Sequence, residues 1–515
     1  NSGKSFVAAA LCRILRQDGY SVAPFKSQNM ALNSYITKDG LEIGRAQAMQ
    51  AEAAGIAPTV DMNPILLKPT SQMGSQVIVN GEVFGNLRAM DYYRRKTEFI
   101  PAVREAFERL ESQFDAIVLE GAGSPAEINL RDNDIVNMGM AKIANAPVLL
   151  VGDIDRGGVF ASLYGTVSLL EPEERARIKG LVINKFRGDV KILEPGLRMI
   201  EERLHIPVVG VIPMEQIDLD DEDSLSDRLV RTKAQDGLDV AVIHLPHISN
   251  FTDFNALEHY DGVSLRYVDR PAHLGQPDLI LLPGTKNTMA DLKWLRESGL
   301  EAMIWRLVEE QKVPVIGICG GYQMLGEQLS DPHGVEGEPG STMRGMGLLA
   351  AETIFAAEKT RTRTEGTVMA AAGVYDQVTG QSVKGYEIHM GETFPAEAGS
   401  GLNGSQQAGA GQQPGNASRA DHSVTPAICL ADGRMDGFVR ADGLVFGSYL
   451  HGLFDNLEFT GAILTRLAEK KGISLTAKAQ SMEEYKESQY DKLADLVRRS
   501  LDMEAVYKIM EEYES

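Results

Sequence analysis

The sequence predicts an α/β protein with two parallel-sheet domains and a helical C-terminal end. Short apolar, β-branched runs alternate with helical patterns along most of the 515 residues, as in doubly wound parallel sheets. Gly3-Lys4-Ser5 leads directly into an amphipathic helix at the start of the chain. Far downstream, the glycine-rich turn Gly317-Ile318-Cys319-Gly320-Gly321 joins an apolar strand to a second helix.

The length, net charge and cysteine content of the chain exclude several classes of protein. A chain of 515 residues that is 43% hydrophobic forms two or three domains with substantial cores. Its net charge of −21 argues against nucleic acid or an anionic membrane as a partner, because both require a basic surface. The three cysteines, Cys12, Cys319 and Cys429, are too few and too scattered for a disulfide framework or a zinc site. With no signal peptide and no apolar run of the ~20 residues that span a bilayer, we expect a cytoplasmic protein.

The first domain is expected over residues 1–230. Its strands are predicted at 21–26, 116–120, 148–152, 180–184 and 208–212, with helical patterns between them, as at 102–110 and 172–178. In such sheets ligands bind at the carboxyl ends of the strands, and the polar residues of this segment gather there. The densely acidic residues 216–229 are interpreted as a solvated linker.

The second domain is expected over residues 238–458. Its strands are predicted at 239–245, 265–268, 279–283, 315–319 and 445–450. Residues 396–423 are rich in Gly, Ala, Gln and Ser, which is typical of a flexible surface insertion. Residues 459–515 are helical and charged, and we expect them to form a tail packed on the second domain.

Gly3-Lys4-Ser5 matches the back half of a P-loop. The sequence starts inside the motif, so we expect the front glycine and its strand to precede Asn1. In this role Gly3 belongs to the backbone cradle, Lys4 neutralises phosphate charge and Ser5 binds Mg²⁺. The tripeptide alone often occurs by chance, but the helix that follows and the later motifs favour an ATP site.

Polar residues follow other predicted strands of the first domain. Glu120 ends one strand before a glycine-rich turn, where P-loop proteins place the acid that holds Mg²⁺; an ordinary loop acid is the alternative. Asn184 follows another strand, where a side-chain amide suits a purine edge. In an acidic protein, loop cations and amides suggest an anionic ligand, although a simple turn also explains the segment around Arg156. These candidate substrate-binding residues are Lys26, Gln28, Asn29, Lys68 and Arg156.

Cys319 lies in the thiol counterpart of a nucleophile elbow, a sharp strand-to-helix turn that projects one side chain. The helix N-terminus beyond it stabilises a thiolate and a developing oxyanion. A buried structural cysteine is the alternative, but it gives the flanking glycines no packing purpose. His451 ends the predicted strand 445–450 and is the candidate base. His389 ranks second, because glycines on both sides suggest a binding loop.

Taken together, these residues resemble the glutamine-hydrolysing cobyric acid synthases of the corrin (vitamin B12) pathway, over almost the whole chain. The most specific segments are residues 24–30 (PFKSQNM), 42–48 (EIGRAQA), 61–69 (DMNPILLKP), 120–127 (EGAGSPAE) and 153–158 (DIDRGG). The first domain resembles the dethiobiotin-synthetase type of P-loop fold. The second resembles a triad-type glutamine amidotransferase.

The resemblance implies a reaction. Such enzymes amidate the b, d, e and g carboxylates of adenosylcobyrinic acid a,c-diamide, using L-glutamine, ATP and Mg²⁺. By similarity, Cys319 attacks the glutamine amide with His451 as base, and ammonia then displaces phosphate from an acyl phosphate of the corrinoid. The oxyanion and glutamine contacts would come from the turn after strand 279–283 and from the elbow, namely Gly284, Gly320, Tyr322 and Gln323.

The resemblance leaves some questions open. Triad amidotransferases usually carry Glu two residues after the histidine, where this chain has Leu453, so the third member is unassigned and a Cys–His dyad is an alternative. A cobyrinic acid a,c-diamide synthase or an amidase of cell-wall precursors would share the architecture, but residues 25–30 and 61–64 favour cobyric acid synthase. A partitioning-type switch ATPase with a degenerate second domain is disfavoured by Cys319 and His451. The oligomeric state, the order of amidation and the ammonia path stay open.

Overall fold

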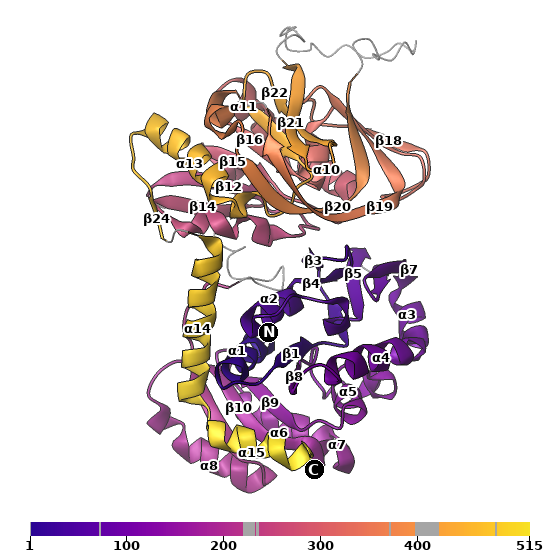
Figure 1. Ribbon diagram of the computed structural model, residues 1–515, viewed down its shortest axis with the longest axis vertical. Helices are drawn as coiled ribbons and strands as arrows, with labels where there is room; N and C mark the ends of the chain where they lie inside the picture. The colour runs from indigo at the N-terminus through magenta and orange to yellow at the C-terminus, as the bar shows by residue number, and fades with distance from the viewer. Residues whose placement is uncertain are drawn as a thin grey trace. The chain divides into compact units, whose positions relative to one another are not determined.

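The computed structural model divides the chain into two compact units (Figure 1). Unit 1 comprises residues 1–222 and 483–515, and unit 2 comprises residues 223–482. The structure describes residues 2–71, 74–219, 232, 236–369, 372–396, 422–478 and 481–514. Most of the expected insertion at 396–423 and most of the acidic segment 216–229 therefore lie outside the described residues.

Unit 1 contains parallel strands at all five predicted positions. β1 (Val22–Phe25) pairs with β8 (Ala116–Leu119), and β9 (Val148–Asp153), β10 (Ile178–Phe186) and β11 (Val208–Pro213) form a second sheet in the order β11-β10-β9. Both expected helices are present, as α4 (Ile100–Glu111) and α7 (Pro172–Arg177). The other helices before residue 222 are α1 (Lys4–Gln17), α2 (Arg45–Ala54), α3 (Ala89–Arg95), α5 (Met138–Ile143), α6 (Val159–Leu169) and α8 (Glu194–Leu204).

Residues 28–88 form a substructure that the sequence analysis did not predict. A four-stranded sheet has the order β2-β5-β6-β7, and β3 pairs with β4 as a separate antiparallel hairpin. The strands are β2 (Gln28–Met30), β3 (Ser34–Ile36), β4 (Glu42–Gly44), β5 (Ile65–Ser71), β6 (Gly74–Val79) and β7 (Glu82–Arg88). Several of these strands are short and polar, so they lack the apolar runs that identified the parallel strands.

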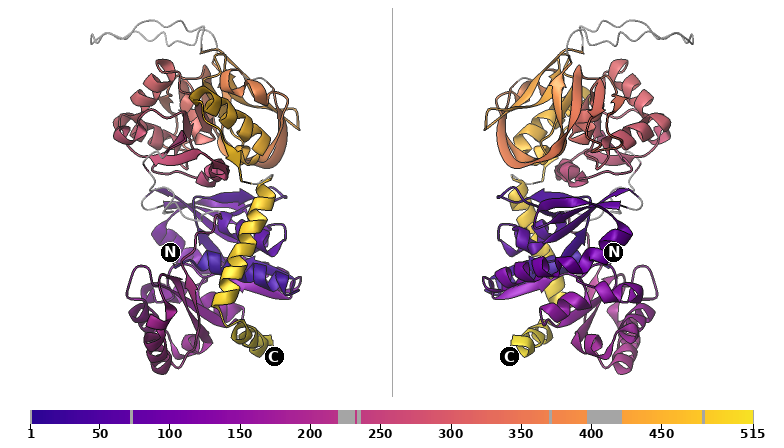
Figure 2. Two further views of the ribbon diagram at one scale, coloured as in Figure 1. Left: turned by 90° about the vertical axis from the view of Figure 1, so that its left-hand side faces the viewer. Right: turned by 90° about the vertical axis from the view of Figure 1, so that its right-hand side faces the viewer.

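The C-terminal helices correct one prediction. α14 (Met482–Ser500) and α15 (Met503–Glu514) follow the body of unit 2, yet residues 483–515 belong to unit 1. Figure 2 shows them from two sides, lying against the elements of that unit. The buried face of α14, including Tyr490, Leu493 and Val497, packs with Val7 and Ile14 of α1. The expected tail on the second domain is therefore wrong beyond α13 (Leu457–Lys471), whose apolar face does lie in the core of unit 2.

Unit 2 is built on an eleven-stranded mixed sheet, counted over the described residues. The parallel strands β14, β12, β15, β16 and β23 lie side by side and correspond to the five predicted strands. Their bounds are Val263–Val268, Leu238–Ile243, Leu279–Leu282, Val315–Ile318 and Val445–Ser448. The remaining strands of the sheet are β17 (Gln328–Asp331), β18 (Ser341–Arg344), β19 (Ala351–Val368), β20 (Ser382–Pro395), β21 (Val424–Leu430) and β22 (Met435–Arg440).

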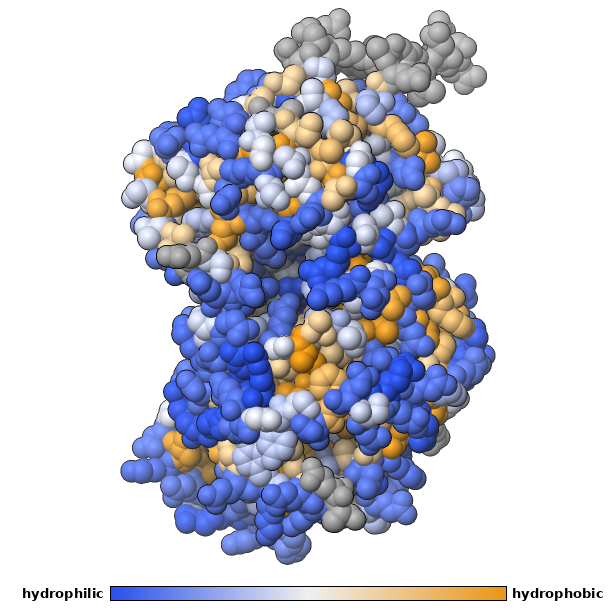
Figure 3. All heavy atoms as spheres, in the orientation of Figure 1, coloured by the Kyte–Doolittle hydropathy of each residue, from blue (hydrophilic) through white to orange (hydrophobic). Residues whose placement is uncertain are grey.

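Helices pack against this sheet and complete a large apolar core. Apart from α13, they are α9 (Pro271–Leu274), α10 (Thr288–Glu297), α11 (Leu300–Glu309) and α12 (Gly320–Leu325), with a long 3-10 segment η6 (Phe251–His259). The central strands β12, β15 and β16 are buried on both faces, as their continuous apolar runs require. The surface drawn in Figure 3 mixes hydrophilic and hydrophobic residues. In the described part of the chain, no helix has the length and apolar character needed to cross a membrane.

Candidate active sites

Cys319 occupies the predicted elbow between β16 and α12. Its backbone has φ 51° and ψ −110°, a conformation that an L-residue adopts only under strain. The glycines around it have a packing reason: a side chain at Gly321 would collide with the carbonyl of Leu282, and one at Gly317 would press on the N–H of Tyr322. The turn therefore closes tightly and holds Cys319, which is 8% exposed, at the carboxyl edge of the sheet.

His451, just beyond β23, is the histidine that the structure joins to Cys319. Its Nδ1 lies 2.7 Å from Asp253 Oδ2, and the side chains of both residues are buried. Burial opposes a charged imidazole, but the charge of Asp253 and the hydrogen bonds to Asp253 and Cys319 outweigh it and raise the pKa of His451 to about 10. Cys319, His451 and Asp253 thus form a line of thiol, imidazole and carboxylate.

Asp253 is a functional candidate that the sequence analysis missed. It lies in η6, 198 residues before His451, and also accepts a hydrogen bond from the N–H of Gly452 at 3.1 Å. The usual spacing places the acid at position 453, where this chain has leucine, and predicts no other position for it. A usable signal existed: His247-Ile248-Ser249-Asn250 follows strand β12, so the polar segment that ends in Asp253 starts from a strand of the same parallel sheet.

The turn after β15 lies against the elbow, as predicted for an oxyanion hole. A side chain at Gly284 would approach His451 Cε1 to 3.2 Å, and one at Gly320 would meet the backbone N of Thr285 at 3.1 Å. Asp291 holds this turn, because its carboxylate accepts hydrogen bonds from Thr285 Oγ1 at 2.5 Å and from the N–H of His247 at 3.1 Å. The structure therefore places the two predicted oxyanion residues, Gly284 and Gly320, on adjoining turns.

Tyr322 and Gln323 lie on the helix after Cys319. The Tyr322 ring is 1% exposed and packs edge-on against Tyr449 and Phe438. The Gln323 amide accepts from Thr288 Oγ1 at 2.8 Å and donates to the Tyr449 hydroxyl at 3.3 Å. Both side chains therefore have partners within the fold, and their predicted contact with glutamine stays a prediction.

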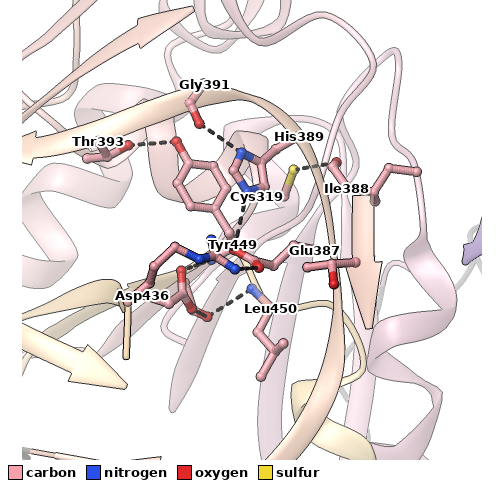
Figure 4. Close-up of polar contacts among 12 residues, drawn as sticks. Cys319, Glu387, Ile388, His389, Gly391, Thr393, Asp436, Tyr449 and Leu450 are labelled. Carbon is pink, nitrogen blue, oxygen red and sulfur yellow. Dashed lines mark hydrogen bonds and ion pairs between the residues drawn. The ribbon is translucent and has the colours of Figure 1, made fainter. Parts of the chain in front are cut away.

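β20 forms the wall on the other side of the thiol (Figure 4). Cys319 Sγ lies 3.7 Å from the carbonyl oxygen of Ile388. His389 is held in a different network: its Nδ1 bonds the Gly391 carbonyl at 2.8 Å, its Nε2 lies 3.5 Å from Glu387 Oε1, and its ring stacks on Tyr449. Burial disfavours ionised Glu387, but hydrogen bonds from His389 and Arg434 prevail and lower the pKa of this carboxyl. Because these hydrogen bonds and the ring stacking hold His389 in a separate network, they support His451 rather than His389 as the base.

In unit 1 the residues predicted to bind phosphate and metal also come together. Ser5 Oγ donates to Glu120 Oε1 at 2.8 Å, and Lys26 Nζ donates to the same oxygen at 3.1 Å. Lys4 Nζ lies 3.3 Å from the Gly123 carbonyl, in the turn after β8. A hydroxyl and a carboxylate at this separation fit Mg²⁺, which takes oxygen ligands and usually few of them from protein.

Several predicted ligand contacts are already satisfied within the fold. Asn184 Nδ2 donates to the Ser2 carbonyl at 2.8 Å and its Oδ1 accepts from Lys185 N at 2.9 Å, so this amide braces the phosphate loop, and its contact with a purine stays a prediction. Lys26 and Lys68 are buried and paired with Glu120 and Glu42, because a buried ammonium requires a carboxylate partner.

The predicted amides Gln28 and Asn29 also have hydrogen-bond partners within the fold, whereas the predicted Arg156 is exposed. Gln28 Oε1 accepts from the Tyr92 hydroxyl at 2.7 Å, and Asn29 Nδ2 donates to Gln47 Oε1 at 3.0 Å. Arg156 is exposed on the turn after β9. The structure therefore does not gather the five predicted substrate residues into one open cationic surface.

Comparisons with known proteins agree with this two-part architecture. Residues 1–227 match the CobQ/CobB/MinD/ParA nucleotide binding domain, and residues 239–459 match the CobB/CobQ-like glutamine amidotransferase domain. A cobyric acid synthase of Lachnoclostridium phytofermentans is 54% identical and covers 99% of this chain and 97% of its own length. This chain belongs to the cobyric acid synthase family.

Further relatives extend the match to the whole chain. A cobyric acid synthase of Ruminiclostridium cellulolyticum is 54% identical over 99% of this chain and 95% of its own length. One from Alkaliphilus metalliredigens is 51% identical over 99% of this chain and 98% of its own length. Like the other cobyric acid synthases, the chain is a glutamine-dependent amide ligase that joins a nucleotide-binding domain to a glutamine amidotransferase domain.

Proposed function

We propose that this chain amidates the b, d, e and g carboxylates of adenosylcobyrinic acid a,c-diamide, with glutamine as nitrogen donor and ATP as the activating substrate. The observation that carries the proposal is the buried line of Cys319, His451 and Asp253, in a chain that aligns over 99% of its length with cobyric acid synthases. The Ser5–Glu120 pair supplies the matching feature in the nucleotide-binding unit.

In the glutaminase half, the Cys319 thiolate attacks the side-chain amide carbon of glutamine. His451 accepts the thiol proton and returns it to the leaving nitrogen, so ammonia departs and a thioester remains. Water, deprotonated by the same imidazole, then releases glutamate. Asp253 bonds Nδ1 and so leaves Nε2 of His451 for the thiol, while the N–H groups at Gly320 and at the turn of Gly284 suit the developing oxyanion.

In the synthetase half, a corrinoid carboxylate attacks the γ-phosphorus of ATP, and ADP leaves. Ammonia then displaces inorganic phosphate from the acyl phosphate and gives the amide. Lys4 neutralises charge on the transferred group, and Ser5 with Glu120 would hold Mg²⁺, which would supply further positive charge to the phosphates. Lys26 supports this site indirectly, since its ammonium holds Glu120 at 3.1 Å.

The competing functions lack such support. A cobyrinic acid a,c-diamide synthase would use the same chemistry on a substrate without the two amides, but the relatives aligned over the full chain are cobyric acid synthases. A switch ATPase has no use for the buried Cys319–His451–Asp253 line.

One assay tests the proposal directly. ADP release is measured with glutamine and ATP, either without a corrinoid, with adenosylcobyrinic acid a,c-diamide or with cobyrinic acid, and the corrinoid products are analysed by mass spectrometry. We expect corrinoid-dependent ADP release and four successive amidations. Amidation of cobyrinic acid that stops at the a,c-diamide would instead assign the chain to the diamide synthases.

A further inference from the structure

Gln50 is a fully buried amide on α2 that lies beside the Ser5–Glu120 pair. Its Nε2 donates to Glu120 Oε2 at 2.6 Å and approaches the Ser5 carbonyl oxygen at 3.3 Å. Its Oε1, in contrast, is buried and has no hydrogen-bond partner among the residues that the structure describes. A buried amide oxygen without a donor is costly, and native proteins rarely leave one so unless a ligand or water completes it.

The orientation of this amide is fixed by its neighbours. Exchanging the oxygen and nitrogen would place Oε1 against the Glu120 carboxylate and the Ser5 carbonyl, which are both acceptors. The unsatisfied atom must therefore be the oxygen, and it belongs to the same planar group that contacts Glu120.

Gln47, one helical turn earlier, provides an internal comparison. Its Nε2 also donates to Glu120 Oε2, at the longer distance of 3.5 Å. Its Oε1 accepts a hydrogen bond from Asn29 Nδ2 at 3.0 Å. The two glutamines thus share one carboxylate oxygen, and of the two only Gln50 has an oxygen without a described donor.

We propose that Gln50 Oε1 accepts a hydrogen bond from a water molecule of the Mg²⁺ held by Ser5 and Glu120. Mg²⁺ keeps several of its waters in nucleotide sites, and each such water is a strong donor next to its protein ligands. Gln50 is then a positioning residue with two contacts on one site, a donor to the carboxylate and an acceptor from the hydrated ion. The inference rests on the proposed ATP site in unit 1.

The test is Mn²⁺ binding, measured by electron paramagnetic resonance with the full-length protein and the β,γ-imido analogue of ATP. Gln50→Met removes both contacts at similar volume, and loss of an outer ligand contact weakens metal binding by about 10–100-fold. Gln47→Met removes the longer bond and should cost less. Gln47 has no unpartnered oxygen, so the difference between the two losses reports the contact of Gln50 Oε1 with the hydrated ion.

If Gln50→Met binds Mn²⁺ as tightly as the wild type, Gln50 does not contact the hydrated ion and the proposal is wrong. Equal effects of Gln50→Met and Gln47→Met would also overturn it. Absence of nucleotide-dependent Mn²⁺ binding in the wild type would instead reject the ATP site itself. A circular dichroism spectrum and thermal unfolding like those of the wild type would show that unit 1, which contains both glutamines, is folded in every variant.

Discussion

Cys319 is defined at the residue scale by its backbone and by its neighbours. The positive φ of 51° projects the thiol from the elbow, and the thiol is one of the groups that raise the pKa of His451, the candidate base. We expect Cys319→Ala to lose glutamine-dependent amidation and to retain amidation with high free ammonia, because the acyl-phosphate site is untouched. Corrinoid amidation assayed with each nitrogen source decides this, and failure of ammonia to rescue would make Cys319 structural.

His451 and His389 can be ranked by their partners. His451→Ala removes the base and should lower the glutaminase rate by about 10²–10⁴-fold. His389→Ala disrupts its contacts with Glu387 and Tyr449 and should cost less, because this ring belongs to the wall formed by β20. Glutamate release from the two purified variants is the measurement. A larger loss in His389→Ala would reverse the assignment of the base.

The ion pair between Asp253 and His451 should make the free energy of unfolding of unit 2 depend on pH. The folded-state pKa of His451 is raised to about 10, above the ~6.5 of an unfolded chain, so the stabilisation is complete below pH ~6.5 and is lost as the pH rises toward 10. Asp253→Asn should destabilise unit 2 by about 3–5 kcal/mol at pH 6.5, since it leaves a buried imidazolium unpaired. Urea unfolding at pH 6.5, 8 and 9.5 should show the difference from wild type narrowing; a constant difference contradicts the proposed pair.

At the scale of elements, the candidate catalytic and metal-binding side chains lie just beyond the ends of strands. β8, β16 and β23 each stop just before a functional side chain, because the carboxyl ends of parallel strands open onto turns where backbone N–H groups and side chains are exposed together. β20 adds a wall that the parallel strands lack: the Tyr386 ring stacks on His451, and Gly385 gives the close approach to the His451 carbonyl that any side chain would block.

α14 is the element whose placement differs most from expectation. Its residue Leu493 is 4% exposed in the core that includes Val7 and Ile14, and Arg13 of α1 bonds Asp491 and Glu487 at 2.8 and 2.7 Å. Leu493→Ala should therefore destabilise unit 1 by about 2–5 kcal/mol. The matched control, Leu467→Ala on α13, should destabilise unit 2 instead.

Thermal unfolding followed with and without ATP separates the two effects, because a ligand stabilises the unit that binds it. We expect the ATP-sensitive transition to fall in Leu493→Ala and the other transition to fall in Leu467→Ala. The reverse pattern would return α14 to the second domain.

At the scale of the whole molecule, the two activities should be separable by mutation. Lys4→Ala or Glu120→Gln should abolish amidation from either glutamine or ammonia. Both nitrogen sources converge on one acyl phosphate, so neither can bypass its loss. Glutamate release and corrinoid amidation measured side by side provide the test; glutamate release should persist, and amidation persisting in both variants would remove the ATP site from unit 1.

The sequence by itself determined the alternation of strands and helices in both units, the phosphate loop, the cysteine elbow and the histidine at the end of β23. These features are local: each consists of a run of apolar residues followed within a few positions by glycine and a reactive side chain. The same local patterns carried the resemblance to cobyric acid synthases, which the full-length relatives confirm.

Only the tertiary structure decided which distant groups meet. Asp253 reaches His451 across 198 residues, Lys26 and Lys68 turn inward to carboxylates, and α14 returns to the unit that begins the chain. Such contacts depend on packing between elements and on the free-energy cost of burying an unpaired charge. Neither effect produces a periodic pattern or a fixed residue spacing in the sequence. The short polar strands of residues 28–88 were missed for a related reason, since their pairing, rather than their own composition, makes them strands.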